Sequence, residues 1–439
     1  MAGKRIDMSV LTQAGHAELD CATDKILRIG IVGLGQASGL VLNWERQDIR
    51  TLPIRFTAAC DLREDALAQF AKEYDAEVYT DVEAMCRSTN VDAVYISSPH
   101  ELHLEHTLIA ARNGKHVLCE KPLSLSVEEV DAMIAACDKH GVHLIAAHSH
   151  AMDAPIRAMR EVIASGRLGP VRHINALNYN FFNAQPWPTR ELQMWHGDLY
   201  NQGPHQMDII RYLGGGVVKS VRAHTWWDHL RNVEGGYSAY IEFANGAAAN
   251  ALFDWRGYFD STCYTFNASE GGWAQDPGSG WFLRGNMKKL LAEKSPEDAE
   301  AELWKLKNDL RYGGVNENES FQRWGYAPVT PGFEPFAEPV QPFFGLIIVA
   351  CDRGIIRQSL EGLYIHDDNG VEEVVVTGHS GRAAEFMQVY DAMFNDTPSF
   401  HDGRWGKGTV ELCQAIEESA REGRPIDLKH QVAVGDEPT

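Results

Sequence analysis

The sequence predicts a protein of two domains, an α/β domain with a Rossmann-type parallel sheet followed by an α+β domain with a large, mainly antiparallel sheet. Three observations support this prediction. The chain has 439 residues, more than one ordinary domain holds. Apolar runs alternate with helical segments up to about residue 150, as the crossover units of a parallel sheet require. Beyond that point, long alternating segments and two Asn-Gly pairs favour antiparallel hairpins.

The first domain is expected over residues 25–150. One helix within it is predicted over about 64–74. Another begins at a capping box, Ser126 and Glu129, and ends at Gly141. Buried strands are predicted for five apolar runs, Ile26–Val32, Ile54–Cys60, Val91–Ser97, His116–Cys119 and Val142–Ala147.

The second domain is expected over residues 151–430, and it begins with a helix over 156–166. The Asn-Gly pairs at 245–246 and 369–370 predict type I′ hairpins. An insertion over about 270–342 contains a charged helical stretch, Met287–Leu310, and we expect it to pack on this domain or on a neighbouring subunit. Residues 1–24 are predicted to be a loosely ordered extension, and 431–439 a tail.

Composition excludes several classes of partner. Forty basic against sixty-one acidic side chains give a net charge of -21, which repels nucleic acid and anionic membranes. No apolar run is long enough to span a bilayer and the N-terminus is polar, so we expect a cytoplasmic protein that binds neither nucleic acid nor membranes. The eight cysteines show no C-x-x-C spacing, so neither a disulfide framework nor a cysteine metal site is indicated.

A glycine-rich turn follows the first predicted strand and opens the first helix. Gly33 permits the tight turn, and Gly35 lets the backbone approach a pyrophosphate at the helix N-terminus. Ser38 replaces the third glycine of the usual G-x-G-x-x-G pattern, and it is small enough for close packing. The turn predicts a dinucleotide site that includes Gln36 and Ala37.

The second strand ends at Asp61, where a carboxylate would bind the hydroxyls of the adenosine ribose. Such a carboxylate repels the 2′-phosphate of NADP, so NAD is the expected cofactor. Arg63, two residues on, qualifies this expectation because an arginine there is able to bind a phosphate. We therefore predict NAD, with NADP less favoured.

Two further motifs resemble the glucose-fructose oxidoreductase and inositol dehydrogenase (Gfo/Idh/MocA) family. The first is Glu120-Lys121-Pro122, preceded by Pro99, His103 and the run 114–117, and the second is the G-x-H-x-x-D element within 203–208. The resemblance spans about residues 26–425. It implies that Lys121 is the catalytic lysine, that His205 is an acid/base group, and that the cofactor is bound additionally by Ser98, Pro99, His103, Glu120, Lys121 and Pro122.

Several stretches are similar to the phthalate 4,5-cis-dihydrodiol dehydrogenase group of that family, among them 201–206, 234–239, 257–261, 344–349 and 401–406. The resemblance implies oxidation of a secondary alcohol of a cyclic diol, and a carboxylated cis-dihydrodiol that yields a catechol is the most specific expectation. It also implies a homo-oligomer, a dimer or a tetramer.

One position departs from the family pattern. Asn201 stands where the family commonly has aspartate, so a carboxylate that would orient His205 or share its proton is missing. Asp208 remains, and the i, i+3 spacing places it on the same helical face as His205. Catalysis and structural support are both open for Asp208.

Other polar and aromatic residues are candidates for substrate contacts. They are His148, His150, Arg190, Trp195 and His196, with Arg231 and Arg256 as further candidates to bind a carboxylate. His148 and His150 would share a face if the strand continued through them, but no third ligand is set by spacing, so no metal is expected. The tryptophans 187, 195, 226, 227 and 255 are expected mostly in the core and at interfaces.

Three alternatives remain open at the level of sequence. The same family also suggests a dehydrogenase of a sugar, sugar acid or cyclitol. A different class would be an NAD-dependent glycosidase or lyase that oxidises its substrate transiently. A non-catalytic nucleotide-binding protein would be indicated by loss of Lys121 or His205, and both are present.

Overall fold

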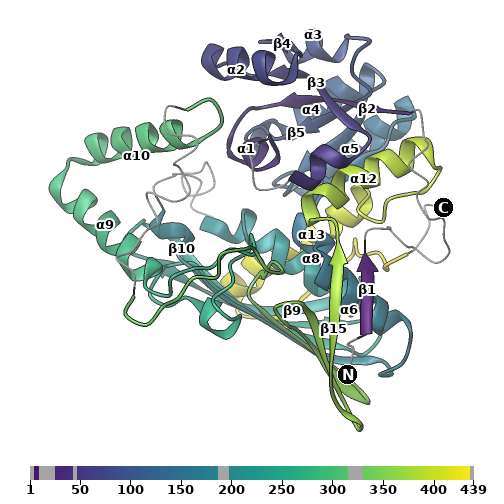
Figure 1. Ribbon diagram of the computed structural model, residues 1–439, viewed down its shortest axis with the longest axis vertical. Coiled ribbons are helices and arrows are strands. Elements are labelled where there is room, and N and C mark those ends of the chain that lie inside the picture. The colour runs from purple at the N-terminus through teal and green to yellow at the C-terminus, as the bar shows by residue number, and fades with distance from the viewer. Residues whose placement is uncertain (1–3, 9–24, 43–46, 186–196, 315–329, 436–439) are drawn as a thin grey trace.

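The computed structural model describes residues 4–8, 25–42, 47–185, 197–314 and 330–435. It contains two sheets, one of six strands and one of ten, and Figure 1 shows them one above the other with helices between and around them. Within the described ranges, none of the helices is both long and apolar enough to cross a membrane.

The six-stranded sheet is entirely parallel, in the order β4-β3-β2-β5-β6-β7. Its strands are β2 (Leu27–Val32), β3 (Ile54–Cys60), β4 (Glu77–Tyr79), β5 (Ala93–Ile96), β6 (His116–Glu120) and β7 (Leu144–Ala147). The prediction is confirmed for the five apolar runs. The remaining strand, β4, is a short edge strand of partly exposed residues, so it has no apolar run to mark it.

Helices cover both faces of this sheet: α1 (Gln36–Leu42), α2 (Glu64–Tyr74), α3 (Val82–Cys86), α4 (His103–Arg112) and α5 (Val127–His140). One half of the predicted capping box is present, because the Ser126 hydroxyl accepts a hydrogen bond from the Glu129 N–H at 3.2 Å, whereas the Glu129 carboxylate accepts from the Ser124 hydroxyl. Gly141 ends α5 in the left-handed conformation, as expected for a helix C-cap.

The ten-stranded sheet has the order β1-β15-β14-β13-β12-β8-β11-β10-β9-β16, and only the pairs β1–β15 and β8–β11 are parallel. The strands are β1 (Lys4–Met8), β8 (Val171–Tyr179), β9 (Val218–Asp228), β10 (Val233–Phe243), β11 (Ala248–Asp254), β12 (Leu346–Cys351), β13 (Gly354–Gln358), β14 (Gly362–Asp367), β15 (Gly370–Gly378) and β16 (Ile426–Asp427). The prediction of a mainly antiparallel sheet is confirmed.

Both predicted hairpins form, but their turns are not of type I′. That type needs a positive φ at both central residues, whereas only Gly246 and Gly370 have one here. At the β10–β11 connection, the Gly246 N–H donates to the Phe243 carbonyl at 3.1 Å. The asparagine keeps an ordinary φ, and the glycine alone takes the left-handed position after the turn.

The N-terminal extension differs in part from the expectation of a loosely ordered segment. Lys4–Met8 form β1, which pairs with β15 at the edge of the ten-stranded sheet. Ile6 is packed against the main core of the second domain. Five residues are too few for the alternation of side chains to be recognised in the sequence.

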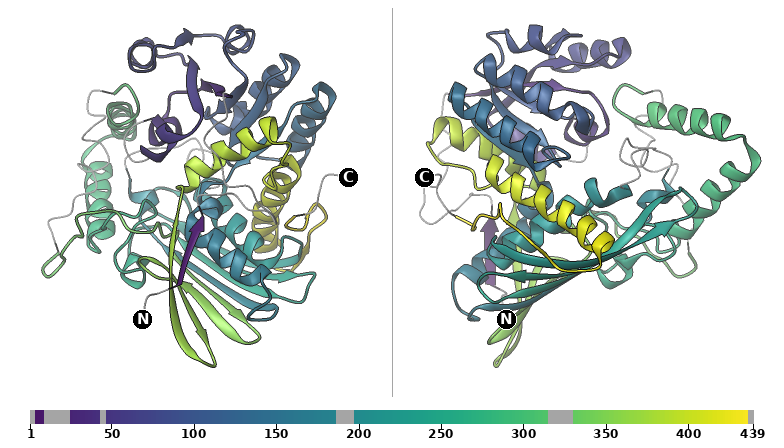
Figure 2. Two further views of the ribbon diagram at one scale, coloured as in Figure 1. Left: turned by 45° about the vertical axis from the view of Figure 1, so that its right-hand side comes forward. Right: turned by 180° about the vertical axis from the view of Figure 1, so that it is seen from behind.

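The helices of the second domain lie on one face of its sheet, between it and the nucleotide-binding domain (Figure 2). They are α6 (Ala154–Ala164), α8 (Gly203–Gly214), α12 (Gly381–Phe394) and α13 (Gly403–Glu422). Helix α12 packs into the core of the first domain, where the Phe386 ring lies 5.7 Å from Phe56 and 5.3 Å from Tyr95. The core of the first domain therefore includes a helix from beyond residue 380.

The insertion contains two helices where one was expected, α9 (Ser279–Glu293) and α10 (Pro296–Leu310). The break lies at Ser295, whose side chain caps α10 and is followed by Pro296 at the first helical position. The insertion projects from the second domain and then turns toward the first (Figure 1). Tyr312, just after α10, is buried in the core of the first domain.

Candidate active site

The glycine-rich turn after β2 has the form that a pyrophosphate needs. Gly33 has φ +91°, and a Cβ atom there would lie 2.9 Å from the Ser97 carbonyl oxygen. Over Gly35 the space is open, with the nearest atom 4.0 Å from such a Cβ. Ser38 is fully buried and its hydroxyl donates to the Gly35 carbonyl at 3.2 Å, which fulfils the packing role of the third glycine.

Helix α1 begins directly after this turn, so Gln36 and Ala37 lie in its first turn, where backbone N–H groups are not used within the helix. The residues present therefore fit a dinucleotide, and the pyrophosphate would be held by the backbone from Gly33 to Ser38.

Asp61 follows β3 and has both carboxylate oxygens engaged by backbone. Leu34 N–H donates to one oxygen at 2.7 Å, and Arg63 N–H donates to the other at 2.8 Å. Each oxygen keeps a further lone pair, so the carboxylate is still able to accept a ribose hydroxyl. The Arg63 guanidinium lies 3.5 Å from Asp61 and donates to the carbonyls of Leu34 and Tyr312.

The loops after β5 and β6 are joined by His103, which is fully buried. Its ring nitrogens lie 2.9 Å from the Ser98 carbonyl and 3.0 Å from the Pro122 carbonyl. Burial lowers the pKa of His103 to about 4. The neutral ring has one N–H, so it donates to one of these two carbonyls while it lies between the Ser98-Pro99 turn and the Lys121-Pro122 peptide, which is cis.

Lys121 is held by Asn201, a residue from the turn before α8. The Lys121 ammonium donates to the Asn201 backbone carbonyl at 2.9 Å and to its side-chain carbonyl at 3.2 Å. The side chain of Lys121 is buried. Asn201 thus contacts the lysine rather than the histidine, and it does so with neutral oxygens.

His205 lies in the first turn of α8 and is buried. Burial lowers its pKa well below the ordinary value, and the charge of Lys121 lowers it further, so the imidazole is neutral at pH 7. Its Nδ1 atom has no hydrogen-bond partner within the described part of the chain. A neutral, unpartnered imidazole is able to accept a proton.

His150 lies against His205, with ring centroids 4.6 Å apart, and Phe344 packs on both rings. The His150 Nδ1 atom lies 2.9 Å from the carboxylate of Asp153, which is itself buried and accepts a hydrogen bond from Gly381 N–H. Asp153 therefore orients His150. Sequence analysis missed Asp153 and Phe344, although the spacing His150-x-x-Asp153 at a helix start was a usable signal.

Asp208 does not point to His205. Its carboxylate lies 3.1 Å from His401 Nε2 and accepts from the Trp405 indole N–H. Burial opposes ionisation, but the neighbouring His148 and His401 and these hydrogen bonds together lower the pKa of Asp208 to about 2. This carboxylate joins α8 to the start of α13.

His148 and His150 do not share a face, because β7 ends at Ala147 and a 3-10 turn follows. His148 points toward His401, with ring centroids 5.6 Å apart. Burial lowers the pKa of His148 to about 4, and neither ring nitrogen has a hydrogen-bond partner among the described residues. Among those residues, no group of three histidines, cysteines or carboxylates is placed to hold a metal ion.

Glu120 directly precedes the lysine and is buried, and its carboxylate is paired with other side chains of the protein. Tyr95 donates its hydroxyl to it at 2.6 Å, and Arg382 of α12 forms an ion pair with it. Arg382 lies 3.3 Å from Glu385 as well. Sequence analysis assigned Glu120 to the cofactor site and did not find Arg382, because the two residues are 262 positions apart.

The remaining candidates are less central or cannot be placed. Arg190, Trp195, His196 and Trp187 lie outside the described residues. Arg256 forms an ion pair with Asp254 at 2.6 Å, and Arg231 donates to the carbonyls of Asn183 and Gln185. Trp255 is fully buried, as expected for a core residue.

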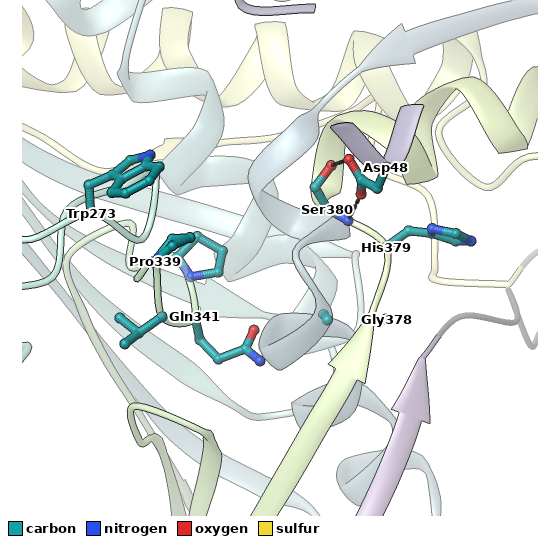
Figure 3. Close-up of a pocket in the computed structure, with 11 residues that line it drawn as sticks. Asp48, Trp273, Pro339, Gln341, Gly378, His379 and Ser380 are labelled. Carbon is teal, nitrogen blue, oxygen red and sulfur yellow. Dashed lines mark hydrogen bonds between the residues drawn. The ribbon is translucent and has the colours of Figure 1, made fainter. Parts of the chain in front are cut away.

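A cavity of about 300 Å³ lies between the end of the insertion and the segment that leads into α12 (Figure 3). Trp273 and Gln341 line one side, and Ser380 lines another with Asp48, whose carboxylate accepts from the Ser380 N–H at 2.7 Å. None of the residues predicted for the active site lines this cavity.

Comparison with known proteins supports both domains. Residues 27–148 match the oxidoreductase family with an NAD-binding Rossmann fold, and residues 156–274 match the GFO/IDH/MocA C-terminal domain. The chain is 32% identical over 404 residues to a 1-carboxy-3-chloro-3,4-dihydroxycyclohexa-1,5-diene dehydrogenase of Comamonas testosteroni, covering 90% of this chain and 95% of that protein.

Two other similarities extend the comparison. A D-glucoside 3-dehydrogenase of Escherichia coli is 31% identical over 247 residues, which is 51% of this chain and 69% of that protein. A crystal structure from Bordetella bronchiseptica RB50 superposes with a TM-score of 0.76 at 32% identity, covering 92% of this chain and 100% of that one.

Proposed function

Because this chain belongs to the Gfo/Idh/MocA family of oxidoreductases, we propose that it oxidises a secondary alcohol of a cyclic diol with NAD. The observation that carries the proposal is the placement of Lys121, held by the carbonyls of Asn201 beside a neutral, buried His205. Lys121 directly follows β6, at the carboxyl end of the parallel strands, where open α/β sheets bind ligands.

The reaction removes a hydride from the carbinol carbon and a proton from its hydroxyl group. When bound, NAD accepts the hydride. Lys121, in its neutral form, takes the hydroxyl proton, and Asn201 keeps its amine in place. His205 accepts the proton in turn, because it is neutral at physiological pH and its Nδ1 atom has no hydrogen-bond partner among the residues that the structure describes. The pair His150–Asp153 lies beside it as the next proton acceptor.

The substrate class is the finer part of the proposal. The Comamonas relative acts on a carboxylated cyclohexadiene diol and matches nearly the whole chain. Oxidation of such a diol gives a hydroxy-dienone that tautomerises to a catechol, and aromatisation makes the step effectively irreversible. A carboxylated cis-dihydrodiol is therefore the substrate we favour.

A sugar or cyclitol is the second candidate, and the similarity to a D-glucoside 3-dehydrogenase favours it. Purified protein should be incubated with NAD and a panel of cis-dihydrodiols, sugars and cyclitols while NADH absorbance is followed. Turnover of carboxylated dihydrodiols is the expected result. Turnover of sugars alone would contradict the substrate assignment and leave the enzyme class intact.

Replacing Lys121 by alanine tests the assigned chemistry. The variant should bind NAD with wild-type affinity but lose kcat by about a factor of 10³ or more, because proton removal loses its acceptor. Binding is measured by calorimetry and turnover by NADH absorbance. Near-normal kcat in the variant would refute the role of Lys121.

Cofactor choice and assembly complete the proposal. Asp61 favours NAD over NADP, so Asp61→Ala should reduce the preference for NAD in kcat/KM. We further propose a cytoplasmic homo-oligomer, a dimer or a tetramer. Light scattering on the purified protein should show more than one copy.

A further inference from the structure

The segment of the insertion that follows α10 packs on the first domain, at the side where Asp61 lies. Tyr312 is 1% exposed, its ring packs on Phe70 with centroids 6.4 Å apart, and its hydroxyl donates to Glu73 at 2.8 Å. A Cβ atom at Gly313 would lie 2.7 Å from Ala66, so the backbone itself is in close contact with α2. These contacts hold the preceding residue, Arg311, in one place.

Arg63 is already engaged by the protein on both terminal nitrogens. Its guanidinium donates to the carbonyls of Leu34 and Tyr312, and its Nε atom lies 3.5 Å from Asp61. Arg63 thus connects the insertion to the glycine-rich turn through hydrogen bonds to both.

Arg311 is the second guanidinium at this place. It is partly buried, and its Nε atom is buried without a hydrogen-bond partner among the described residues. Burial lowers the pKa of Arg311, the charge of Arg63 lowers it further, and Asp61 and Asp65 oppose the shift. The side chain therefore lies among the groups that surround the ribose site, with part of its hydrogen-bonding capacity unused.

We propose that Arg311 is a binding residue for the adenosine half of the dinucleotide, supplied to the first domain by the insertion. This inference rests on the proposed dinucleotide site at Asp61. A guanidinium has a flat face that stacks on a purine and edges that donate to ribose or phosphate oxygens. An adenine nucleotide thus offers an acceptor to the Arg311 Nε atom, which has none among the described residues. Substrate and nicotinamide are bound elsewhere, at Lys121.

The experiment compares wild type with Arg311→Ala and Arg311→Gln, by calorimetric titration with NAD and with ADP, which carries the adenosine half alone. Lys289→Ala is the control, since Lys289 lies in the same insertion with a side chain 72% exposed. Both Arg311 variants should bind NAD and ADP about tenfold more weakly, and Lys289→Ala should match wild type. Thermal denaturation shows whether each Arg311 variant is folded. The binding affinities of a folded variant then decide whether Arg311 contributes to the site.

The results separate the two proposals. If wild type binds NAD and ADP, and a folded Arg311 variant binds ADP equally well, the role of Arg311 is refuted and the dinucleotide site stands. Weakened NAD binding with unchanged ADP binding also refutes it, because the lost contact is then not to adenosine. If wild type binds neither ligand, both proposals fail.

Discussion

At the scale of single residues, the contact between Lys121 and Asn201 affects whether the lysine is in the neutral form that accepts the substrate's hydroxyl proton. The lysine is buried and hydrogen-bonded to two carbonyl oxygens, neither of which carries a charge. A carboxylate at the same position would stabilise the ammonium form, in which the lysine is unable to accept a proton. An asparagine in place of a carboxylate therefore adds no negative charge beside the lysine.

Replacing Asn201 by aspartate tests this argument. The rising limb of kcat against pH should move to higher pH by about one unit or more, because a negative charge beside Lys121 retains its proton. Asn201→Ala is the control, since it keeps the backbone carbonyl and adds no charge. An Asn201→Asp profile that coincides with wild type would show that Lys121 is not the group that titrates in catalysis.

Gly33 is the residue on which the turn geometry depends. An alanine there would have a strained φ and a Cβ atom 2.9 Å from the Ser97 carbonyl oxygen. Gly33→Ala should weaken NAD binding at least tenfold and lower the free energy of unfolding by about 2–4 kcal/mol. Gly114→Ala is the matched control, because Gly114 also has a positive φ but nothing lies within 4 Å of the added atom. The control should lose about 1–2 kcal/mol of stability and keep its affinity for NAD.

At the scale of elements, helix α12 matters because it carries Arg382 and Glu385 into the first domain. Arg382 lies between two carboxylates, Glu120 on β6 and Glu385 on its own helix. Burial raises the pKa of Glu385 to about 8, helped by Glu120 and opposed by Arg382. Glu120, with both Arg382 and Tyr95 as partners, stays ionised. The cluster thus holds one proton near neutral pH and joins α12 to the strand that precedes Lys121.

This proton has a consequence for stability. The pKa of Glu385 is higher in the folded than in the unfolded protein, so the folded state binds more protons between about pH 4.5 and pH 8. The stabilisation is complete below that range and is lost as the pH rises through it. Glu385→Gln keeps the shape of the protonated side chain and has no proton to lose.

Thermal denaturation between pH 5 and pH 9 measures the effect. Relative to wild type, the Tm of Glu385→Gln should rise with pH, by up to about 5 °C at the alkaline end. Subtracting the two curves removes the titration of all other groups. A constant difference in Tm across the range would show that Glu385 is ionised in the folded protein.

At the scale of the whole molecule, the insertion connects the two domains at a further place, besides the chain crossing near residue 150 and helix α12. It leaves the ten-stranded sheet through α9 and α10 (Figure 1), and Tyr312, just after α10, is buried in the core of the first domain. A buried aromatic side chain that also makes a hydrogen bond contributes several kcal/mol to such a contact. The connection therefore limits how far the two domains separate.

Replacing Tyr312 by alanine should release this connection. We expect the free energy of unfolding to fall by about 3–5 kcal/mol and amide exchange in α10 to become faster. Trp304→Ala is the control, since Trp304 lies on the same helix with its side chain 37% exposed. Unchanged exchange in α10 of Tyr312→Ala would mean that the helix is held by other contacts.

Much of the fold was predictable from the sequence because its signals are local. Strand periodicity, the capping box at Ser126, the glycine-rich turn and the helix end at Gly141 each depend on a few neighbouring residues. The residues of the glycine-rich turn were found in the same way, whereas Lys121 and His205 were identified through the resemblance of their motifs to a known family. What these signals specify is backbone conformation and the ends of parallel strands, which together place a ligand site.

Only the tertiary structure decided which side chains meet there. Asp208 has the right spacing for His205 but binds His401 and Trp405, and Asn201 contacts the lysine. Arg382 and Arg311 reach the first domain from positions more than 160 residues beyond its last strand, β7. Such contacts depend on how whole elements pack, and packing is set by the shape and burial of all the side chains together. The sequence by itself determined the two-domain architecture and where the site lies, and the packing decided which residues complete it.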